Sequence, residues 1–308
     1  MRHAVIDIGP NTVKLLVADV RDGQVFPLVS KDRTTRLGEG LAVRASGLRS
    51  FHLPEPTAAG ETPAPPRLSR VAMTRTIQTV DEFFNEARRL SAQHVLALTT
   101  SAVREAENRD EFLDGVRGQC GLEVQIITGE REAELIFYGV SSDPEWSGRS
   151  ILALDVGGGS SEFIQGQRGK MERFESLPLG AVRLTEQYGE NYDALVEFLR
   201  QTLRGPLEGF NARDRKMIGT GGTITTLARI GCGTMDRVTL SQEEIRKLVA
   251  RLNALPLAER REVPGLPPER ADIIVAGGAV FLVAMELLGA EELTISVRSL
   301  RYGALLSM

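Results

Sequence analysis

The chain repeats one short pattern, a strand that ends in Asp-x-Gly and is followed almost at once by another strand. Asp7-Ile8-Gly9 and Asp155-Val156-Gly157 carry this pattern, and they lie 148 positions apart in a chain of 308 residues. Two such strands joined by a few residues predict a hairpin, and a hairpin that opens each half predicts two lobes of related topology. The paired strands are expected at Ala4–Ile8, Val13–Val20, Ser150–Val156 and Ser161–Gly166.

Elsewhere, runs with helical periodicity alternate with short apolar runs, which predicts an α/β architecture with largely parallel sheets. We expect one lobe at 1–125 and another at 126–298, with a C-terminal helix at 299–308 packed back on the first lobe. Further strands are expected at Gln24–Ser30, Val95–Thr99, Leu122–Ile127, Met171–Leu177, Lys216–Gly219 and Leu293–Val297. Helices are expected at Thr79–Ala92, Ser101–Val116, Arg131–Gly139, Leu179–Tyr188, Asp193–Leu207, Thr223–Ile230, Gln242–Asn253 and Pro268–Leu288.

Residues 42–67 differ from the rest of the chain. They contain five prolines together with Ala, Gly and Ser, and they show no periodicity. This composition is typical of a surface loop or mobile flap, with an ordinary disordered insertion as the alternative.

Net charge and hydropathy limit the classes of binding partner that we expect for this chain. The formal net charge is −4, whereas a nucleic-acid binder usually carries a basic face, so we expect no nucleic-acid partner. The longest apolar run, Ile273–Leu288, is interrupted by glycines and Glu286 and is too short to span a bilayer. Neither Cys120 nor Cys232 has a metal-ligating neighbour, which indicates reduced, at least partly buried thiols. We therefore expect a cytoplasmic protein without a membrane partner.

The glycine turns suit phosphate chemistry. Backbone N–H groups of glycine can approach a phosphate without steric clash, and an Asp before such a turn can hold Mg²⁺ through water. A third cluster, Gly219–Thr223, lies between a strand and a helix, where the helix dipole favours anions. A plain hairpin or strand-to-helix turn is the alternative for each cluster. Side chains that add hydrogen bonds to phosphate oxygens are Asn11, Thr12, Ser160 and Ser161.

Hydrolysis requires a base that activates water, and carboxylates are the candidates. The histidines, His3, His52 and His94, form no catalytic pattern. Glu162 follows the second glycine turn closely. Glu130, Glu132 and Glu134 sit where a strand passes into a helix, and residue spacing alone leaves the choice among them open. Near a similar transition, Arg104 could meet a phosphate oxygen or form a surface ion pair.

These segments together resemble the exopolyphosphatase and guanosine pentaphosphate phosphohydrolase family across nearly the whole chain. Their order and spacing are far more specific than any single motif. The matching segments are IDIGPNTVKLLV at 6–17, TRLGEGL at 35–41, TSAVREAEN at 100–108, ITGEREAELIFYGV at 127–140, LDVGGGSSEFI at 154–164, LPLGAVRLTE at 177–186, GTGGTITTLA at 219–228, RADIIVAGGAVF at 270–281 and SLRYGAL at 299–305.

The resemblance implies two actin-like lobes, as in sugar kinases, with the active site between them. It also implies Mg²⁺ and stepwise release of terminal orthophosphate. The family's catalytic glutamate falls on Glu132, which would position or deprotonate the attacking water. Asp155 and Glu162 would act on metal and water, and Arg104 would clamp the terminal phosphate. The phosphate loops fall on Asp7, Gly9, Asn11 and Thr12, on Gly157, Gly158, Gly159, Ser160 and Ser161, and on Gly221, Gly222 and Thr223.

The sequence departs from the family pattern in three places. Pro10 replaces the usual Ser of the first loop and removes a hydroxyl and an N–H donor. Arg131 and Glu134 exchange the charges common at their positions. The chain also stops at Met308, where longer members carry further helical domains. We therefore expect a short-type member that prefers short chains or dimerises to extend its groove.

Three functions fit these motifs. Hydrolysis of inorganic polyphosphate comes first, and removal of the 5′ γ-phosphate from guanosine pentaphosphate (pppGpp) uses the same chemistry. A nucleotide-binding regulator that has lost turnover is the alternative from a different class. Retention of Glu132, Asp155 and Glu162 argues against the regulator, and Pro10 argues for it.

Overall fold

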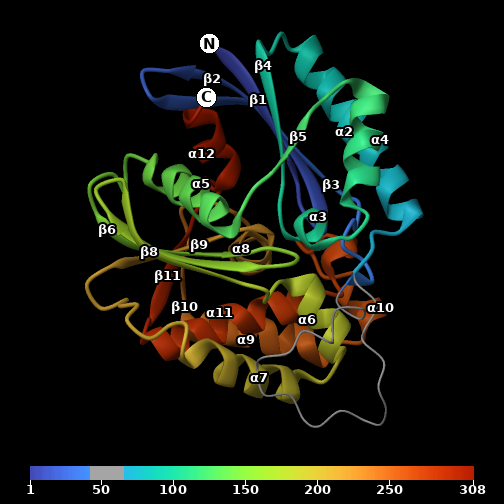
Figure 1. The fold of residues 1–308 in the computed structure, drawn as a ribbon. Coiled ribbons are helices and arrows are strands. Elements are labelled where there is room, and N and C mark those ends of the chain that lie inside the picture. Colours follow the sequence, from blue (N-terminus) through green and yellow to red (C-terminus); the bar gives the residue numbers. More distant parts are fainter. Residues whose placement is uncertain (42–65) are drawn as a thin grey trace.

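The computed structural model of the protein describes residues 1–41 and 66–308. It contains two sheets with helices packed against them (Figure 1). The Pro-rich segment predicted at 42–67 falls outside the described residues, apart from its last two.

The first sheet has the strand order β3-β2-β1-β4-β5. Strands β1 and β2 are antiparallel, as are β2 and β3, whereas β1, β4 and β5 run parallel. We call the part built on this sheet the first lobe. The strands span Arg2–Ile8 (β1), Thr12–Arg21 (β2), Gln24–Thr34 (β3), His94–Thr99 (β4) and Val124–Ile126 (β5).

The second sheet repeats this order as β8-β7-β6-β9-β11 and adds β10 at its edge. The part built on it is the second lobe. Again the opening hairpin and the strand after it are antiparallel, and the strands that follow are parallel. The prediction of largely parallel sheets is therefore wrong, because each half opens with an antiparallel meander. The strands span Ser150–Val156 (β6), Ser161–Gln167 (β7), Lys170–Leu177 (β8), Lys216–Thr220 (β9), Thr239–Ser241 (β10) and Glu292–Ile295 (β11).

Most predicted helices are present with shifted ends. The helices of the first lobe and of the region between the two sheets are α2 (Arg70–Arg89), α3 (Ser101–Glu105), α4 (Arg109–Cys120), α5 (Gly129–Ser141) and α12 (Leu300–Leu306). Those of the second lobe are α6 (Ala181–Tyr188), α7 (Tyr192–Arg204), α8 (Gly222–Cys232), α9 (Gln242–Ala254), α10 (Leu257–Arg260), the 3-10 helix η1 (Pro268–Arg270) and α11 (Ile274–Leu288).

Two predicted helices are broken. The one expected at Ser101–Val116 divides into α3 and α4 because Ala106 is extended and the buried Asn108 side chain exchanges two hydrogen bonds with the backbone of Leu68. The one expected at Pro268–Leu288 divides into η1 and α11. This break lets Asp272 reach Arg36 of the first lobe, at 2.7 Å.

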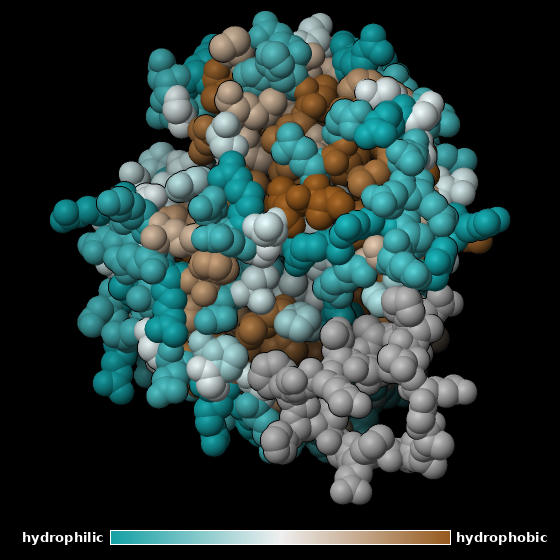
Figure 2. Space-filling model, viewed as in Figure 1, coloured by the Kyte–Doolittle hydropathy of each residue, from teal (hydrophilic) through white to brown (hydrophobic). Residues whose placement is uncertain are grey.

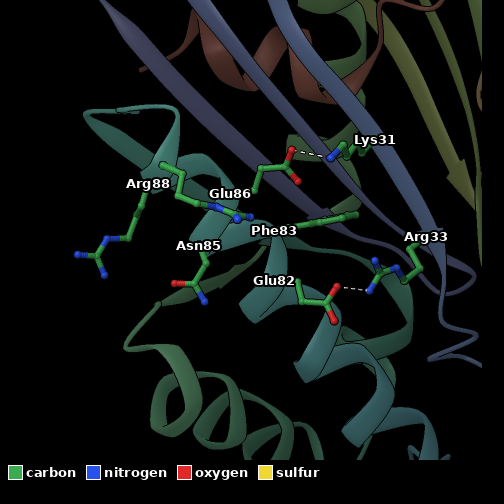
Figure 3. A pocket seen from close by; sticks show the side chains of 8 residues that line it. Lys31, Arg33, Glu82, Phe83, Asn85, Glu86 and Arg88 are labelled. Carbon is green, nitrogen blue, oxygen red and sulfur yellow. Dashed lines mark hydrogen bonds and ion pairs between the residues drawn. The ribbon is translucent and has the colours of Figure 1, made fainter.

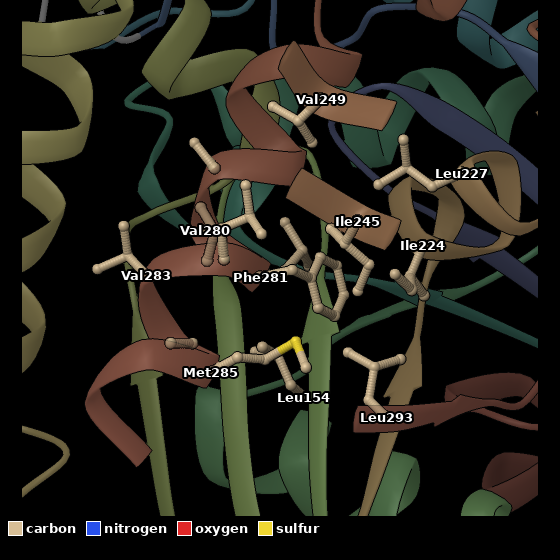
Figure 4. Packing of buried hydrophobic residues seen from close by; sticks show 14 of the residues in the cluster. Leu154, Ile224, Leu227, Ile245, Val249, Val280, Phe281, Val283, Met285 and Leu293 are labelled. Carbon is tan, nitrogen blue, oxygen red and sulfur yellow. The ribbon is translucent and has the colours of Figure 1, made fainter. Parts of the chain in front are cut away.

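The core of the second lobe forms around α11 (Figure 4). Phe281 is fully buried and packs among side chains from α8, α9 and the sheet. Gly277 lies against the Thr223 side chain, and Gly278 lies against Val249. Both glycines lie inside α11, where the lack of a side chain makes room for Thr223 and Val249.

A separate hydrophobic cluster joins the two sheets. It contains Val5 and Leu16 of the first sheet, Ile151 of the second, and buried faces of α5 and α12. The two helices pack closely, since a Cβ atom on Gly303 would lie 1.8 Å from the Leu135 carbonyl oxygen. The C-terminal helix therefore lies between the sheets (Figure 1). The lobe boundary at 125/126 stays a prediction.

The surface carries both hydrophilic and hydrophobic areas. Figure 2 shows a mostly hydrophilic face with a hydrophobic area where Figure 1 draws β4 and β5. Within residues 1–41 and 66–308, no helix has the length and apolarity that crossing a bilayer requires. Cys120 and Cys232 are free thiols; Cys232 is exposed, against the expectation of burial, because it ends α8 at the surface.

Candidate functional site

The two Asp-x-Gly turns are closed in the same way. The Gly9 N–H donates to the Thr12 carbonyl at 3.1 Å, and the Gly157 N–H donates to the Ser160 carbonyl at 3.0 Å. The predicted correspondence between the halves therefore extends to the hydrogen bonding of the turns.

The two turns touch each other. A Cβ atom on Gly158 would lie 3.2 Å from the Asn11 amide nitrogen, and one on Gly159 would lie 3.1 Å from Pro10 Cγ and 2.3 Å from Ser101 Oγ. Any side chain at Gly159 would therefore displace Ser101. The first and second glycine turns form one junction between the lobes, with α3 beside it.

The third glycine turn, at Gly221, lies beside the second one. Gly221 has φ +92°, and a Cβ atom there would lie 2.8 Å from Asp155 Oδ1. Such a φ strains any residue with a side chain, so Gly221 is required both for its backbone and for its closeness to the carboxylate. We call the three turns, with the carboxylates beside them, the lobe junction.

Arg270 connects the third turn to the first. Its guanidinium lies where a Cβ atom on Gly222 would be, and its Nη2 donates to Thr12 Oγ1 at 3.4 Å. Burial lowers the pKa of Arg270. Arg270 stands in one of the matching segments, but the sequence alone assigns it no role. Nothing in the local sequence shows that η1 returns to the first turn.

Among the three acidic residues of the α5 start, the structure separates Glu132 from the other two. Glu130 is exposed, and Glu134 forms an ion pair with Arg131 at 2.8 Å. Glu132 is only 7% exposed, and Arg104 Nη1 lies 3.7 Å from its Oε2. Arg104 also donates to the Ile127 carbonyl at 2.8 Å, which holds the guanidinium over the α5 start.

The buried glutamates resist ionisation. Burial is the main cause that raises the pKa of Glu132 well above its usual value; the Glu162 carboxylate adds to this and Arg104 opposes it. Burial, followed by repulsion from Asp155, raises the pKa of Glu162 to about 8, although Ser160 and Ser176 hydrogen bonds counteract this. A pKa near neutrality suits a group that exchanges protons with substrate or water.

The two aspartates share one cation. Burial raises the pKa of both Asp7 and Asp155, and the Lys14 ammonium lowers both. Ser299 Oγ donates to Asp155 Oδ2 at 2.7 Å. Sequence reasoning missed Lys14, because an isolated lysine in a strand gives no signal until its partner strand is known.

Several buried polar atoms at the lobe junction have no hydrogen-bond partner among residues 1–41 and 66–308. They are Asn11 Oδ1, Ser101 Oγ and Glu132 Oε2. Buried polar atoms are nearly always paired with protein or water, so their clustering indicates a place for ligand or water.

Some predicted phosphate ligands have side chains that already make contacts within the fold. The Ser161 hydroxyl donates to the Leu179 carbonyl at 2.7 Å. Thr223 is buried in the first turn of α8, against Gly277. The remaining predicted residues lie at the three turns or beside them.

Asp155 and Glu162 fit a magnesium ion. They lie directly opposite each other on β6 and β7. Glu162 is buried and Asp155 is partly buried, and Asp155 raises the pKa of Glu162. Mg²⁺ is usually bound by one or two carboxylates with waters and substrate phosphates. In the described part of the chain, no group of three or more His, Cys, Asp or Glu side chains is arranged as a complete metal site. The pair suits a magnesium ion that keeps most of its water.

A hollow of about 650 Å³ lies elsewhere, between β3 and α2 (Figure 3). Two ion pairs cross it, Lys31 with Glu86 and Arg33 with Glu82. None of the predicted site residues lines it.

The strand order of the sheets, the turns that meet between them and the buried carboxylates define a two-lobed α/β protein of the actin-like class. The sequence model of the Ppx/GppA phosphatase family matches residues 16–308, so the chain belongs to that family.

Relatives of two named activities match nearly the whole chain. Exopolyphosphatase 1 of Mycobacterium tuberculosis is 33% identical, with 99% of this chain and 88% of the relative covered. The guanosine-5'-triphosphate,3'-diphosphate pyrophosphatase of Vibrio vulnificus is 29% identical, but this chain spans only 58% of it. The solved structure of the Aquifex aeolicus PPX-GPPA enzyme superposes with a TM-score of 0.77 at 30% identity, covering 100% of this chain and 99% of that one.

Proposed function

We propose that the protein is an exopolyphosphatase, which releases terminal orthophosphate from inorganic polyphosphate at the lobe junction. The observation that carries the proposal is the buried Glu132 carboxylate beside three glycine turns. Its Oε2 accepts no hydrogen bond within the described residues and lies 3.7 Å from Arg104. The exopolyphosphatase relatives, which this chain matches over 88% of their length or more, support that substrate class.

In the proposed reaction, a water oxygen attacks the terminal phosphorus. The bond between this phosphorus and the bridging oxygen breaks, and the shortened chain leaves with the bridging oxygen. Glu132 takes the proton from water, and Arg104 balances charge on the terminal phosphate oxygens. The turns hold the phosphate through backbone N–H groups that do not close the turns themselves, such as those of Asn11 and Gly158.

Asp155 and Glu162 would hold Mg²⁺, which would neutralise charge that develops on the bridging oxygen. Burial, and after it repulsion from Asp155, raises the pKa of Glu162 to about 8, and a bound cation would oppose this shift. Lys14 gives the aspartates partial compensation. The proposal assigns phosphate binding to Asp7, Gly9, Asn11 and Thr12, to Gly157, Gly158, Gly159, Ser160 and Ser161, and to Gly221, Gly222 and Thr223.

The second candidate is 5′-phosphate removal from pppGpp, favoured by the Vibrio relatives. Both substrates present a terminal phosphoanhydride to the same carboxylates. Orthophosphate release measured with Mg²⁺ on both substrates separates them: faster turnover of polyphosphate supports the proposal, and faster turnover of pppGpp favours this second activity. Release from neither supports the reduced nucleotide-binding regulator.

A further inference from the structure

The carbonyl groups of the three glycines in the second turn all accept hydrogen bonds from α6. The Ala181 N–H donates to the Gly157 carbonyl at 2.9 Å, and the Val182 N–H donates to the Gly158 carbonyl at 2.9 Å. The next carbonyl, that of Gly159, accepts from Arg183 Nε at 3.2 Å. Three consecutive peptide groups are therefore fixed by one short segment.

This arrangement decides where the N–H groups of the turn point. In a planar trans peptide, the C=O and the following N–H point in opposite directions. The carbonyls of Gly157, Gly158 and Gly159 are held by α6, so the N–H groups of Gly158, Gly159 and Ser160 are directed away from α6. Asn11 and Ser101 lie against this turn.

The third peptide differs from the first two in how it is held. Backbone donors fix the carbonyls of Gly157 and Gly158, whereas a side chain fixes that of Gly159. The side chain of Arg183 is itself held in place. Its Nη2 donates to Glu105 Oε2 at 2.6 Å, and the arginine side chain is only 14% exposed.

The support comes from the other lobe. Glu105 ends α3, the same helix that carries Ser101 and Arg104. Arg183 belongs to α6 of the second lobe. One guanidinium thus links the second phosphate turn to the helix of the phosphate-clamping arginine, and a planar fork that donates in two directions suits this role.

We propose that Arg183 is a positioning residue, which holds the Gly159 carbonyl so that the Ser160 N–H faces the phosphoryl group, and that Glu105 locks it when the lobes meet. The inference rests on the proposed phosphohydrolase function. The Ser160 N–H stabilises negative charge on the phosphate oxygens most strongly in the transition state, so Arg183 acts on kcat more than on KM.

The test compares Arg183→Gln and Glu105→Gln on polyphosphate with Mg²⁺. We expect Arg183→Gln to lower kcat by about tenfold to a hundredfold, less than the roughly 10²–10³ lost when an oxyanion donor is removed outright. KM should change by about threefold or less. Glu105→Gln keeps the donor to Gly159, so its loss should be smaller. An Arg183→Gln enzyme with wild-type kcat would overturn the proposal.

A charge-reversed double variant separates positioning from simple ion pairing. Glu105→Arg combined with Arg183→Glu restores opposite charges across the lobes but leaves the Gly159 carbonyl without a donor. We expect this variant to regain thermal stability relative to each single reversal but not kcat. Recovery of kcat together with stability would show that only the ion pair matters.

A readout without turnover keeps the inference separate from the proposed function. In amide NMR spectra of the whole protein titrated with inorganic phosphate, the Ser160 shift should move in the wild type and move less in Arg183→Gln. The control Arg117→Gln removes an exposed ion pair with Glu123 and should leave both kcat and this shift unchanged. A wild type inactive on every substrate defeats the proposed function; an unaltered Ser160 response in Arg183→Gln defeats the inference.

Discussion

Lys14 and Glu162 occupy the same position in the two matching hairpins. Lys14 lies opposite Asp7 in the first, and Glu162 lies opposite Asp155 in the second. The repeated backbone therefore presents a cation on one side of the lobe junction and an acid on the other. A polyanion and its metal ion need these opposite charges at neighbouring places.

Replacing Lys14 by Gln should weaken the binding of a polyanionic substrate. Because Lys14 lowers the pKa of Asp7 and Asp155, its loss also leaves both aspartates harder to ionise. We expect KM for polyphosphate to rise about tenfold, which corresponds to roughly 1.4 kcal/mol. Steady-state kinetics measure this, with the exposed Lys170→Gln as control. Equal KM values in the two variants would argue against a role for Lys14.

Glu132→Gln should remove most turnover and leave binding intact. The amide keeps the shape of the side chain but cannot take a proton from water, and general-base catalysis contributes about 10²–10⁴-fold. The control is Glu130→Gln, which changes an exposed carboxylate two residues earlier in α5. Orthophosphate release and substrate binding are measured on both. Near-normal rates in Glu132→Gln would mean that another group activates the water.

Glu162 should make the metal-free protein less stable as the pH rises. Its pKa is about 8 in the folded protein, against 4.5 for an ordinary glutamate, so between these values the folded state holds a proton that the unfolded state has lost. The free energy of unfolding therefore falls from pH 5 to pH 8. Glu162→Gln removes this titrating carboxyl group and should raise the free energy of unfolding at pH 8 by up to a few kcal/mol.

Urea unfolding at several pH values, with chelator present, measures this effect. The wild-type and Glu162→Gln curves should converge near pH 5 and separate toward pH 8. Added Mg²⁺ should reduce the wild-type slope, because a cation favours the ionised carboxylate. Parallel curves at every pH would show that Glu162 is not the group responsible.

Arg270→Gln should impair binding more than chemistry. Arg270 joins Thr12 of the first turn to Gly222 of the third, so its loss leaves those turns less firmly held and removes a partly buried positive charge from the lobe junction. We expect KM for polyphosphate to rise by about tenfold or more. Steady-state kinetics are compared with the exposed Arg261→Gln. A variant with unchanged KM would place Arg270 outside the binding site.

The hairpins and their correspondence could be predicted from sequence because Asp, Gly and strand periodicity are local signals. Asp7 and Asp155 fall where expected, and so do the glycines that follow them. The break between α3 and α4 could not be predicted, since it depends on Asn108 meeting Leu68, a contact 40 residues away along the chain.

The residues of the candidate site, too, could be predicted from sequence only in part. Residue spacing left Glu130, Glu132 and Glu134 as alternatives, and only burial and the Arg131 ion pair distinguish them. Arg270 lies 258 residues from Thr12, and no local pattern indicates that they meet. Long-range packing therefore supplied the part of the site that periodicity and motif spacing could not.

The central claim is that water attacks the terminal phosphorus at the lobe junction. It is tested most directly by running the reaction on polyphosphate in ¹⁸O-labelled water with Mg²⁺ and analysing the products by mass spectrometry. The account predicts one ¹⁸O in each orthophosphate released and none in the shortened chain. Label in the chain end, or phosphate passed to an acceptor without label, would contradict it.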